Sequence, residues 1–526
     1  MKGLLCVAAA VLAVSVVSGP AAYAMNVPVL AAEDESGSSL DEILDDLENS
    51  TPAELNYANP MGYWAGMTYV NENMGISLTL PDSFEILETQ NDSQVSYLVA
   101  AADSQAQEFF QLVSVDLTVS DDEDLTEQEC LELMGESLVS SAGLSVSNEA
   151  FSTATLGGQD WTQMSVDISS EDGAGGQARC YCLKDVSTAY IATVISFEGG
   201  NTGIQAILDS ITPLEQGVWN GNVYMNEGMG ISMTIPERFA ITKNDSSLAD
   251  AGLIFYAMAQ DTGETIQMFS ISTEDGVPED YDEEDLLNDV LSGMTESDEY
   301  TLGEEKFSDV EICGTDYTLM TVTASYGEGA DIGFNYYGRL TDDMAYVLVC
   351  TGLDSQALAD EVIQAAIPCE SGSFYGETYL NTSIGIGFTL PETWDVLSGY
   401  TQESGYDQAF MAGDADSGES IQLQVYNLEE LGLSDLTEEV YGQQIMEIYE
   451  DQGLDAEDTI GSIAIGSAPY SVVTATGNIE GWAVKMNICY RIQDDHLYVF
   501  FFTCDQAEQT EGYSDMLAQM GITGEM

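Results

Sequence analysis

The chain has 526 residues and carries 92 Asp and Glu residues against 9 Lys and Arg residues, so its formal net charge is −83. Nucleic-acid backbones and anionic membranes are bound through clustered cations, so this composition excludes both as partners. Hydrophobic residues make up 44% of the chain and aromatic residues 9%, more than acidic disordered proteins carry. The acidic residues therefore belong to folded domains, of which the length predicts about three or four.

The N-terminal segment has the pattern of an export signal. Lys2 provides a positive start, and the apolar run from Leu4 to Val17 is too short to span a bilayer comfortably. Ala22 and Ala24 place small residues at both positions that determine cleavage. We expect cleavage after Ala24 and a secreted, extracellular protein. No later segment approaches the roughly 18 apolar residues of a membrane span.

A signature of thirteen residues occurs three times in the chain. It runs from Tyr69 to Pro81, and its shared positions are Tyr-x-Asn, then Gly-Ile, then Thr-Leu/Ile-Pro. The other two copies end at Pro236 and Pro391, so successive prolines are 155 residues apart. This regularity predicts three tandem copies of one domain. An aromatic residue follows each proline by three positions and is expected in the core: Phe84, Phe239 and Trp394.

The signature divides the chain into five parts. We assign residues 1–24 to the signal peptide and residues 25–59 to an acidic linker that holds one short amphipathic helix. The three copies then occupy residues 60–214, 215–369 and 370–526. The segments between copies are short, so we expect a compact array.

Each copy is predicted to contain the same elements in the same order. The signature is read as two strands joined by a turn at a glycine, and a second hairpin follows. An acidic helix comes next, and in the first copy Thr126 and Glu129 have the spacing of a capping box. Four strands around Trp161, Tyr317 and Tyr470 and a short terminal helix complete the unit. The order ββ-ββ-α-ββββ-α predicts an α+β fold, an antiparallel sheet with helices packed on it.

The copies resemble a known superfamily. Each begins with a strand of the form Gly-Ile-x-x-Thr-Leu-Pro-x-x-aromatic, and the second copy has a strand that starts at Gly314-Thr-Asp-Tyr317. The stretch from Arg339 to Tyr346 is similar to the basic-turn-Tyr-Val-Leu hairpin of the PsbP/Mog-type (PsbP-like) family. The resemblance implies an antiparallel β-sheet flanked by helices and a non-catalytic binding or assembly role. It supplies no active site, since that superfamily shares no catalytic motif.

Basic residues are scarce enough to be informative. After removal of the signal peptide eight remain, and an alignment of the final hairpins places Lys184, Arg339 and Arg491 at one equivalent position. On the simpler interpretation each cation offsets the carboxylates of the turn that follows it. Alternatively these residues form a binding site, in which an isolated cation anchors a carboxylate of a partner.

Eight cysteines remain after cleavage, and most do not recur at matching positions. In the alignment Cys182 and Cys489 match each other and Tyr337. Cys180 and Cys182 lie two apart on a predicted strand, a poor geometry for a mutual disulfide. Buried free thiols are therefore the expected state.

Catalytic and metal-binding motifs are sparse. The chain has one histidine, His496, and none of the standard nucleophile, phosphate-loop or zinc motifs. We therefore predict no catalytic residues, no metal site and no cofactor. Clustered acids such as Asp414 to Glu419 and Asp121 to Asp124 are expected to give at most weak, diffuse divalent-cation binding.

The sequence favours an exported, non-enzymatic protein with three PsbP/Mog-like domains. Its expected role is multivalent extracellular binding or assembly, with an unknown extracellular protein or cell-surface ligand as partner, because three weak sites gain avidity when joined. The alternative is a secreted hydrolase that uses a carboxylate pair in one domain. A third reading is a precursor or surface coat whose main property is its charge.

Overall fold

The computed structural model of the chain describes most of the sequence after residue 61. The described residues are 62–87, 95–118, 125–140, 145–169, 175–185, 187–197, 202–243, 252–273, 281–294, 300–326, 331–341, 344–403, 406–415, 417–451, 454–466, 468–479, 482–505 and 510–522. The predicted signal peptide, the predicted linker and the acidic run 121–124 lie outside them. No helix of the described part is long and apolar enough to cross a membrane.

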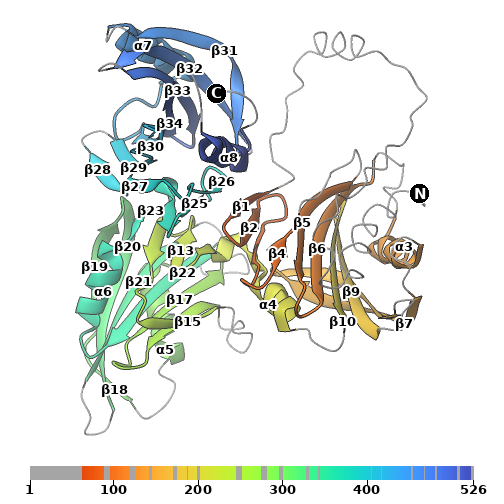
Figure 1. The fold of residues 1–526 in the computed structure, drawn as a ribbon. Coiled ribbons are helices and arrows are strands. Elements are labelled where there is room, and N and C mark those ends of the chain that lie inside the picture. The colour runs from red at the N-terminus through yellow and green to blue at the C-terminus, as the bar shows by residue number, and fades with distance from the viewer. Residues whose placement is uncertain are drawn as a thin grey trace, which may run out of the picture. The chain divides into compact units, whose positions relative to one another are not determined.

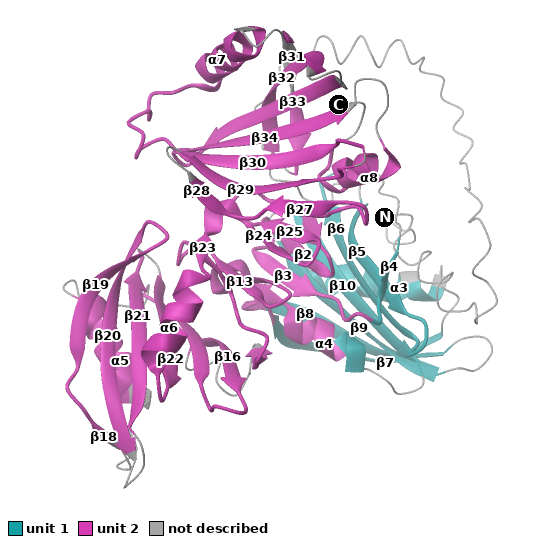
Figure 2. Ribbon diagram, turned by 60° about the vertical axis from the view of Figure 1, so that its left-hand side comes forward, with its two compact units in different colours: residues 1–58, 83–155, 160–204 teal, residues 59–82, 156–159, 205–526 magenta. Residues whose placement is uncertain are grey.

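The chain separates into two compact units, coloured teal and magenta in Figure 2. Among its described residues, unit 1 holds the ranges 83–155 and 160–204. Unit 2 holds residues 59–82, 156–159 and 205–526. This division does not follow the predicted domain bounds, because residues 59–82, which carry the first signature, belong to unit 2. The bounds drawn from the sequence period stay predictions.

Unit 1 is built on one antiparallel sheet with the strand order β4-β5-β6-β10-β9-β8-β7 (Figure 1). Its strands are β4 (Glu85–Ile86), β5 (Val95–Asp103), β6 (Glu108–Asp116), β7 (Ser145–Leu156), β8 (Gln159–Ser169), β9 (Gly175–Lys184) and β10 (Thr188–Phe197). Helix α3 (Glu127–Ser140) packs on β9, and α4 (Thr202–Ser210) follows β10. The α3 side chains Leu131, Met134 and Leu138 are fully buried in a core with strand residues.

The predicted capping box at the start of α3 is confirmed. The Thr126 amide donates to the Glu129 carboxylate at 2.8 Å, and the Glu129 amide donates to the Thr126 hydroxyl at 3.3 Å. These reciprocal bonds satisfy donors that the first turn of a helix otherwise leaves free.

Unit 2 contains three small antiparallel sheets, each built on one signature, which we call the hairpin sheets. The first joins β1 (Tyr63–Ala65), β2 (Thr68–Asn71), β3 (Ile76–Thr79) and β11 (Thr212–Pro213). The second joins β12 (Val218–Asn220), β13 (Val223–Asn226), β14 (Ile231–Thr234) and β23 (Ile367–Pro368). The third joins β24 (Ser373–Tyr375), β25 (Thr378–Asn381) and β26 (Ile386–Thr389). The 3₁₀ turns η1 (Leu214–Gln216) and η3 (Cys369–Ser371) lead into the second and third sheets.

Unit 2 also contains two large antiparallel sheets. The strands of one are β15 (Phe239–Lys243), β16 (Leu253–Ala259), β17 (Thr265–Ser272), β18 (Tyr300–Leu302), β19 (Lys306–Ile312), β20 (Thr315–Tyr326), β21 (Ile332–Leu340) and β22 (Met344–Gly352). Those of the other are β27 (Asp395–Ser398), β28 (Thr401–Glu403), β29 (Tyr406–Gly413), β30 (Ser420–Asn427), β31 (Asp455–Ile465), β32 (Ala468–Ile479), β33 (Trp482–Gln493) and β34 (His496–Asp505). Their helices are α5 (Glu283–Met294), α6 (Ser355–Gln364), α7 (Glu438–Asp451) and α8 (Glu511–Gln519).

Each large sheet of unit 2 has a core on both faces. On β33, Ile488 and Tyr490 pack in the core that includes residues of α7, whereas Cys489 packs in the core that includes residues of α8. The alternation follows from the two-residue period of a strand, which sends neighbouring side chains to opposite faces. The aromatic residues after the signature prolines are buried, as expected: Phe84, Phe239 and Trp394.

The expectation of an α+β fold is wrong, because the chain is β-rich. The helices are short, nine to fourteen residues, while the sheets have up to eight strands and several strands reach eleven or twelve residues. The sequence prediction also placed each signature in one sheet with the rest of its copy. The structure instead pairs the strands of each signature in a separate small sheet.

Candidate functional site

The signature folds into its hairpin because an asparagine bridges the turn. In the second copy the Asn226 amide donates to the Tyr224 hydroxyl at 3.0 Å, and the Met229 amide donates to Asn226 Oδ1 at 2.9 Å. Gly230 ends the turn with a φ of 71°, a left-handed conformation that glycine adopts without steric cost. The same bonds occur in the first copy at Asn71 and in the third at Asn381.

The three hairpin sheets contact one another. The Thr68 hydroxyl of the first donates to the Trp219 carbonyl of the second at 3.2 Å. The Asn220 amide of the second donates to the Thr378 carbonyl of the third at 3.0 Å. Strand β1 packs against β26, which brings the third sheet against the first. One apolar cluster draws residues from all three signatures and their flanks: Tyr63, Ala65, Val70, Val218, Val223, Met225, Cys369 and Leu380.

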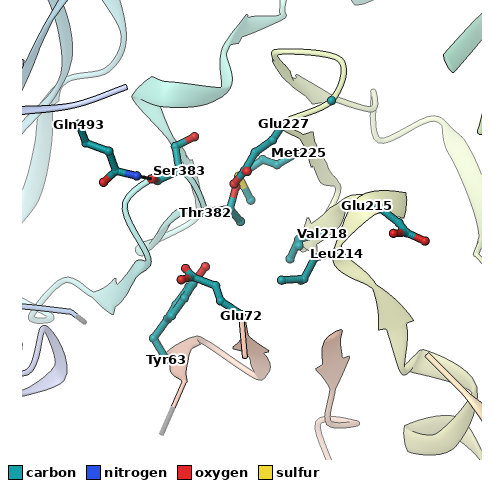
Figure 3. A pocket seen from close by; sticks show the side chains of 11 residues that line it. Tyr63, Glu72, Leu214, Glu215, Val218, Met225, Glu227, Thr382, Ser383 and Gln493 are labelled. Carbon is teal, nitrogen blue, oxygen red and sulfur yellow. Dashed lines mark hydrogen bonds between the residues drawn. The ribbon is translucent and has the colours of Figure 1, made fainter. Parts of the chain in front are cut away.

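A cavity of about 440 Å³ opens beside this cluster, entirely within unit 2 (Figure 3). We call it the hub cavity. Glu72, Glu227 and Thr382 occupy the same position in the three signatures, directly after the turn asparagine, and all three line it. The other polar lining residues are Tyr63, Glu215, Ser383 and Gln493, and the apolar ones are Leu214, Val218 and Met225. The same position of the signature thus contributes one residue from each of the three copies to the lining of the hub cavity.

The two glutamates of the hub cavity are harder to ionise than free carboxyl groups. Glu72 and Glu227 are exposed as whole residues. Partial burial of the carboxyl group nevertheless raises the pKa of Glu72, the charge of Glu227 raises it further, and the charge of Arg491 lowers it. Burial also raises the pKa of Glu227, while a hydrogen bond from the Thr382 hydroxyl lowers it. Desolvation and like charge both disfavour the carboxylate form. A positive group that entered the cavity would relieve both effects.

Tyr63 places a polar atom without a partner at the same cavity. The residue is only 8% exposed, and its buried hydroxyl makes no hydrogen bond. Burial raises the pKa of the Tyr63 phenol well above its usual value, and the charges of Glu72 and Glu227 raise it further. Figure 3 shows the ring beside Glu72, with the hydroxyl directed into the space that the two glutamates share. A buried hydroxyl normally has a partner, so this one is suited to a ligand.

Gly228 sets the width of the cavity on one side. A side chain there would place its Cβ 2.2 Å from the Tyr346 hydroxyl, so only glycine fits. The Tyr346 hydroxyl in turn donates to the Glu215 carbonyl at 3.3 Å. This close approach connects β22, and so the large sheet of β15 to β22, with the wall of the hub cavity.

Two of the three predicted cationic site residues lie on equivalent positions, and the third does not. Arg339 stands opposite Tyr346 on β22, and Arg491 stands opposite Tyr498 on β34 in the same way. Burial raises the pKa of Tyr317 and the charge of Arg339 lowers it, and the charge of Arg491 acts likewise on the pKa of Tyr470. In unit 1 the residue opposite Tyr190 is Leu183.

Lys184 therefore matches Leu340 and Ile492 and lies on the other face of its sheet, the face of Cys182 and α3. The sequence alignment was one residue out of register here. Of the three, the charge of Arg491 reaches the hub cavity by its effect on Glu72. One Arg339 nitrogen, Nη1, is buried near Gly230 and makes no hydrogen bond. A binding role for Lys184, Arg339 and Arg491 stays a prediction.

The same registers correct the cysteine alignment. Cys489 matches Tyr181 and Tyr337, whereas Cys182 matches Tyr490. All eight cysteines of the described chain are free thiols, and Cys313 alone among them is not buried. Burial raises the pKa of Cys180 and of Cys350 to about 12.

Of the acidic clusters considered for divalent cations, the run 121–124 lies outside the described residues. Among the residues that the structure describes, no group of three or more His, Cys, Asp or Glu side chains could hold a metal ion. Glu419, at the end of one cluster, is 2% exposed and accepts hydrogen bonds from the amide and hydroxyl of Thr510 at the start of α8. It is a helix cap, and Glu108 accepts from the Ile204 amide of α4 in the same manner. The His496 ring lies against its own turn, 2.9 Å from the Asp494 carbonyl.

Sequence reasoning missed the hub cavity because it read the whole signature as structural. That reading suits the tyrosine, the asparagine and the glycine. The signal for a site was the position directly after the asparagine, which holds Glu72, Glu227 and Thr382. A surface position in a hairpin turn can hold many residue types, so the pattern alone did not indicate that the three would meet.

Comparison with known proteins adds structural neighbours. No family model and no curated protein matches the chain. The solution structure of cyanobacterial PsbP (CyanoP) from Synechocystis is similar to 29% of this chain and is itself covered to 98%, at 12% identity and a TM-score of 0.22. A crystal structure from Bacteroides thetaiotaomicron is similar over 33% of this chain and 55% of its own, at 11% identity and a TM-score of 0.20.

Proposed function

We propose that this chain is an exported, non-enzymatic binding protein whose copies act together to hold one ligand in the hub cavity. The N-terminal export pattern supports the location, and the shared cavity supports the role. A PsbP/Mog-like arrangement of each copy is part of the same proposal.

One observation carries the proposal, namely the meeting of Glu72, Glu227 and Thr382 around one cavity. Each residue comes from a different copy, so an isolated copy contains only part of the lining. The cavity volume falls within the range of roughly 300–1,000 Å³ typical of small-molecule sites. Its lining combines a few polar groups with apolar side chains, as such sites do.

The proposal is tested by ligand screening with the mature chain, residues 25–526. Thermal unfolding is followed in the presence of amines, amino acids, sugars and short peptides, since a ligand of the folded state raises the midpoint. Thr382→Phe fills the cavity and serves as the matched variant. We expect a ligand that stabilises the natural chain, binds once per chain and has no effect on Thr382→Phe. The proposal fails if no compound stabilises the natural chain.

Multivalent contact through three separate sites is the competing form of the binding hypothesis. It predicts about three ligands per chain and an affinity that Thr382→Phe leaves largely unchanged. The hydrolase alternative required two acids within one domain, whereas the two acids of the hub cavity come from different copies. Stoichiometry from calorimetry therefore separates one shared site from three separate ones.

A further inference from the structure

We propose that the hub cavity binds a positively charged nitrogen group, a primary ammonium or a guanidinium carried on a short apolar stem. This inference rests on the proposed binding function and names its ligand class. The group would lie between Glu72, Glu227 and the Tyr63 hydroxyl, with its stem along the apolar wall. The same chemistry occurs in free amines and in Lys or Arg side chains of a partner protein.

The charge of the lining selects a cation. Glu72 and Glu227 both border the cavity, and partial burial raises the pKa of both. The charge of Glu227 adds to this effect on Glu72, and the charges of Glu370 and Asp494 add to it on Glu227. Arg491 is the cation whose charge acts on Glu72, so one positive charge faces two carboxyl groups. An anionic ligand would add a third negative charge to this space, whereas a cation would restore balance.

The hydrogen-bonding groups of the lining are mainly acceptors. Carboxylates only accept hydrogen bonds, and the hydroxyl oxygens of Tyr63 and Thr382 can accept as well. The Gln493 amide nitrogen donates to the Ser383 carbonyl at 3.3 Å, which turns that donor away from a ligand. An ammonium offers three donors and a guanidinium five, with no acceptor. The donors of such a group match the acceptors of the cavity.

The second, independent observation is the Tyr63 hydroxyl. It belongs to a side chain that is 8% exposed, makes no hydrogen bond, and is directed into the cavity beside Glu72 (Figure 3). Leaving a buried hydroxyl unpaired is unfavourable, and a nitrogen donor at this place would satisfy it. The two glutamates and the unpaired Tyr63 hydroxyl thus border the same cavity and favour the same kind of ligand.

The cavity is too large and too apolar for a bare metal ion. Ca²⁺ takes six to eight oxygen ligands at short distance. Here Leu214, Val218 and Met225 form one side of a space of about 440 Å³. Methylene groups pack well on such a wall while a terminal charge stays among the polar groups. The mixture suits an alkyl amine or a Lys or Arg side chain.

The test is isothermal titration calorimetry of the mature chain at 150 mM NaCl with four probes. n-Butylamine represents a free amine, and Nα-acetyl-lysine methylamide represents a protein side chain. n-Butanol and Nα-acetyl-norleucine methylamide are their uncharged counterparts. We expect at least one charged probe to bind with one site per chain and its uncharged counterpart to bind at least tenfold more weakly. The charged probe that binds more tightly identifies the source of the ligand.

Variants locate the binding to the cavity. Glu72→Gln and Glu227→Gln are each expected to weaken the charged probe about tenfold to a hundredfold, the usual range for a hydrogen bond to a charged group. Tyr63→Phe is expected to weaken it severalfold. Glu392→Gln is the control, since Glu392 is exposed and outside the cavity, and its affinity should equal that of the natural chain. Circular dichroism verifies that each variant is folded.

Several results would overturn the inference. These are no saturable binding of either amine, equal binding of the uncharged probes, or equal affinity in Glu72→Gln, Glu227→Gln and Glu392→Gln. Many weak sites per chain in all variants would show only counterions around an acidic protein. Tight binding of Ca²⁺ at one site, with both amines inactive, would also contradict it. If another compound binds once per chain and Thr382→Phe abolishes it, the ligand class is wrong while the proposed function stands.

Discussion

The hairpin sheets and the large sheets of unit 2 use the chain in different ways. Each large sheet of unit 2 has two cores formed with its own helices, and one of the two also includes buried residues of a hairpin sheet. The hairpin sheets share one apolar cluster, to which all three signatures or their flanks contribute. The second and third signatures therefore pack both on a large sheet of their own copy and on the other signatures, whereas the cores that include α5 and α7 draw on one copy alone. A change in a hairpin should affect other copies, and a change in the α5 or α7 core should stay local.

The largest effect is expected for Asn226→Ala in the second hairpin. Asn226 is 1% exposed and bonds to the Tyr224 hydroxyl, the Glu215 carbonyl and the Met229 amide. Alanine removes all three bonds, and the buried Met229 amide loses its partner, while the Tyr224 hydroxyl keeps its bond to the Gln216 carbonyl. We expect a loss of about 3 kcal/mol in the free energy of unfolding, about 1 kcal/mol for each bond. Urea unfolding measures it. A loss below about 1 kcal/mol would show that the hairpin does not depend on the Asn226 hydrogen bonds. It would then contradict the difference inferred between the hairpin sheets and the large sheets.

A smaller and local effect is expected for Glu419→Ala, directly before β30 in the large sheet of β27 to β34. The Glu419 carboxylate accepts from the amide and hydroxyl of Thr510, which begin α8. Loss of this cap should cost about 2 kcal/mol. Hydrogen exchange should show faster opening of α8 with no change at the first and second hairpin sheets, since α8 packs on β26 of the third. Faster exchange in all three hairpins would contradict the local character of this region.

Glu227→Gln is expected to stabilise the protein by less than about 1 kcal/mol at neutral pH, because Glu227 is exposed as a residue and solvent screens its charge. The pKa of Glu227 in the folded state is raised above its ordinary value of 4.5, so protonation favours the folded state. That contribution is complete below the ordinary value and is lost as pH rises through the raised pKa. The advantage of the variant should therefore appear at neutral pH and vanish on acidification. Unfolding midpoints from pH 4 to pH 8 measure it, with Glu392→Gln as the unchanged reference.

The smallest effects separate the three cations. Arg491→Gln should cost about 1 kcal/mol, because Arg491 lies opposite Tyr498 on a covered face and its charge acts on Tyr470. Lys184→Gln should change stability by less than about 0.5 kcal/mol, a typical value for a partly exposed position. Urea unfolding of both variants compares them. Equal losses would restore the equivalence that the sequence alignment assigned to these residues.

Part of this structure was readable from the sequence, and the part that was not has a physical reason. The capping box at Thr126 follows from a local pattern and is confirmed. Four described strands lie between α3 and α4, as predicted, whereas six described strands precede α3, where four were expected. The separation of the signature into its own sheet depends on contacts such as Thr68 with Trp219, which are 151 residues apart. The one-residue error at Lys184 arose because the alignment matched basic residues with one another: Arg339 and Arg491 lie seven residues before Tyr346 and Tyr498, whereas Lys184 lies six residues before Tyr190. Register in a strand decides the face of every side chain, so such an error moves a residue across the sheet.

The candidate site was hidden for the same reason. Glu72 and Glu227 are ordinary acidic residues among 92 acidic residues. Their role depends on the meeting of hairpins that lie 155 residues apart in sequence, and no local pattern contains that information.

The central claim is that carboxyl groups from different copies share one cavity, and a double-mutant cycle tests it most directly. Glu72→Gln, Glu227→Gln and the double variant are compared by urea unfolding at pH 8. The charge of Glu227 raises the pKa of Glu72, so either single substitution removes their repulsion. We predict that the double variant gains less stability than the sum of the single gains, by at least about 0.5 kcal/mol. Gains that add within about 0.3 kcal/mol would show that the two residues do not meet and would contradict the shared cavity.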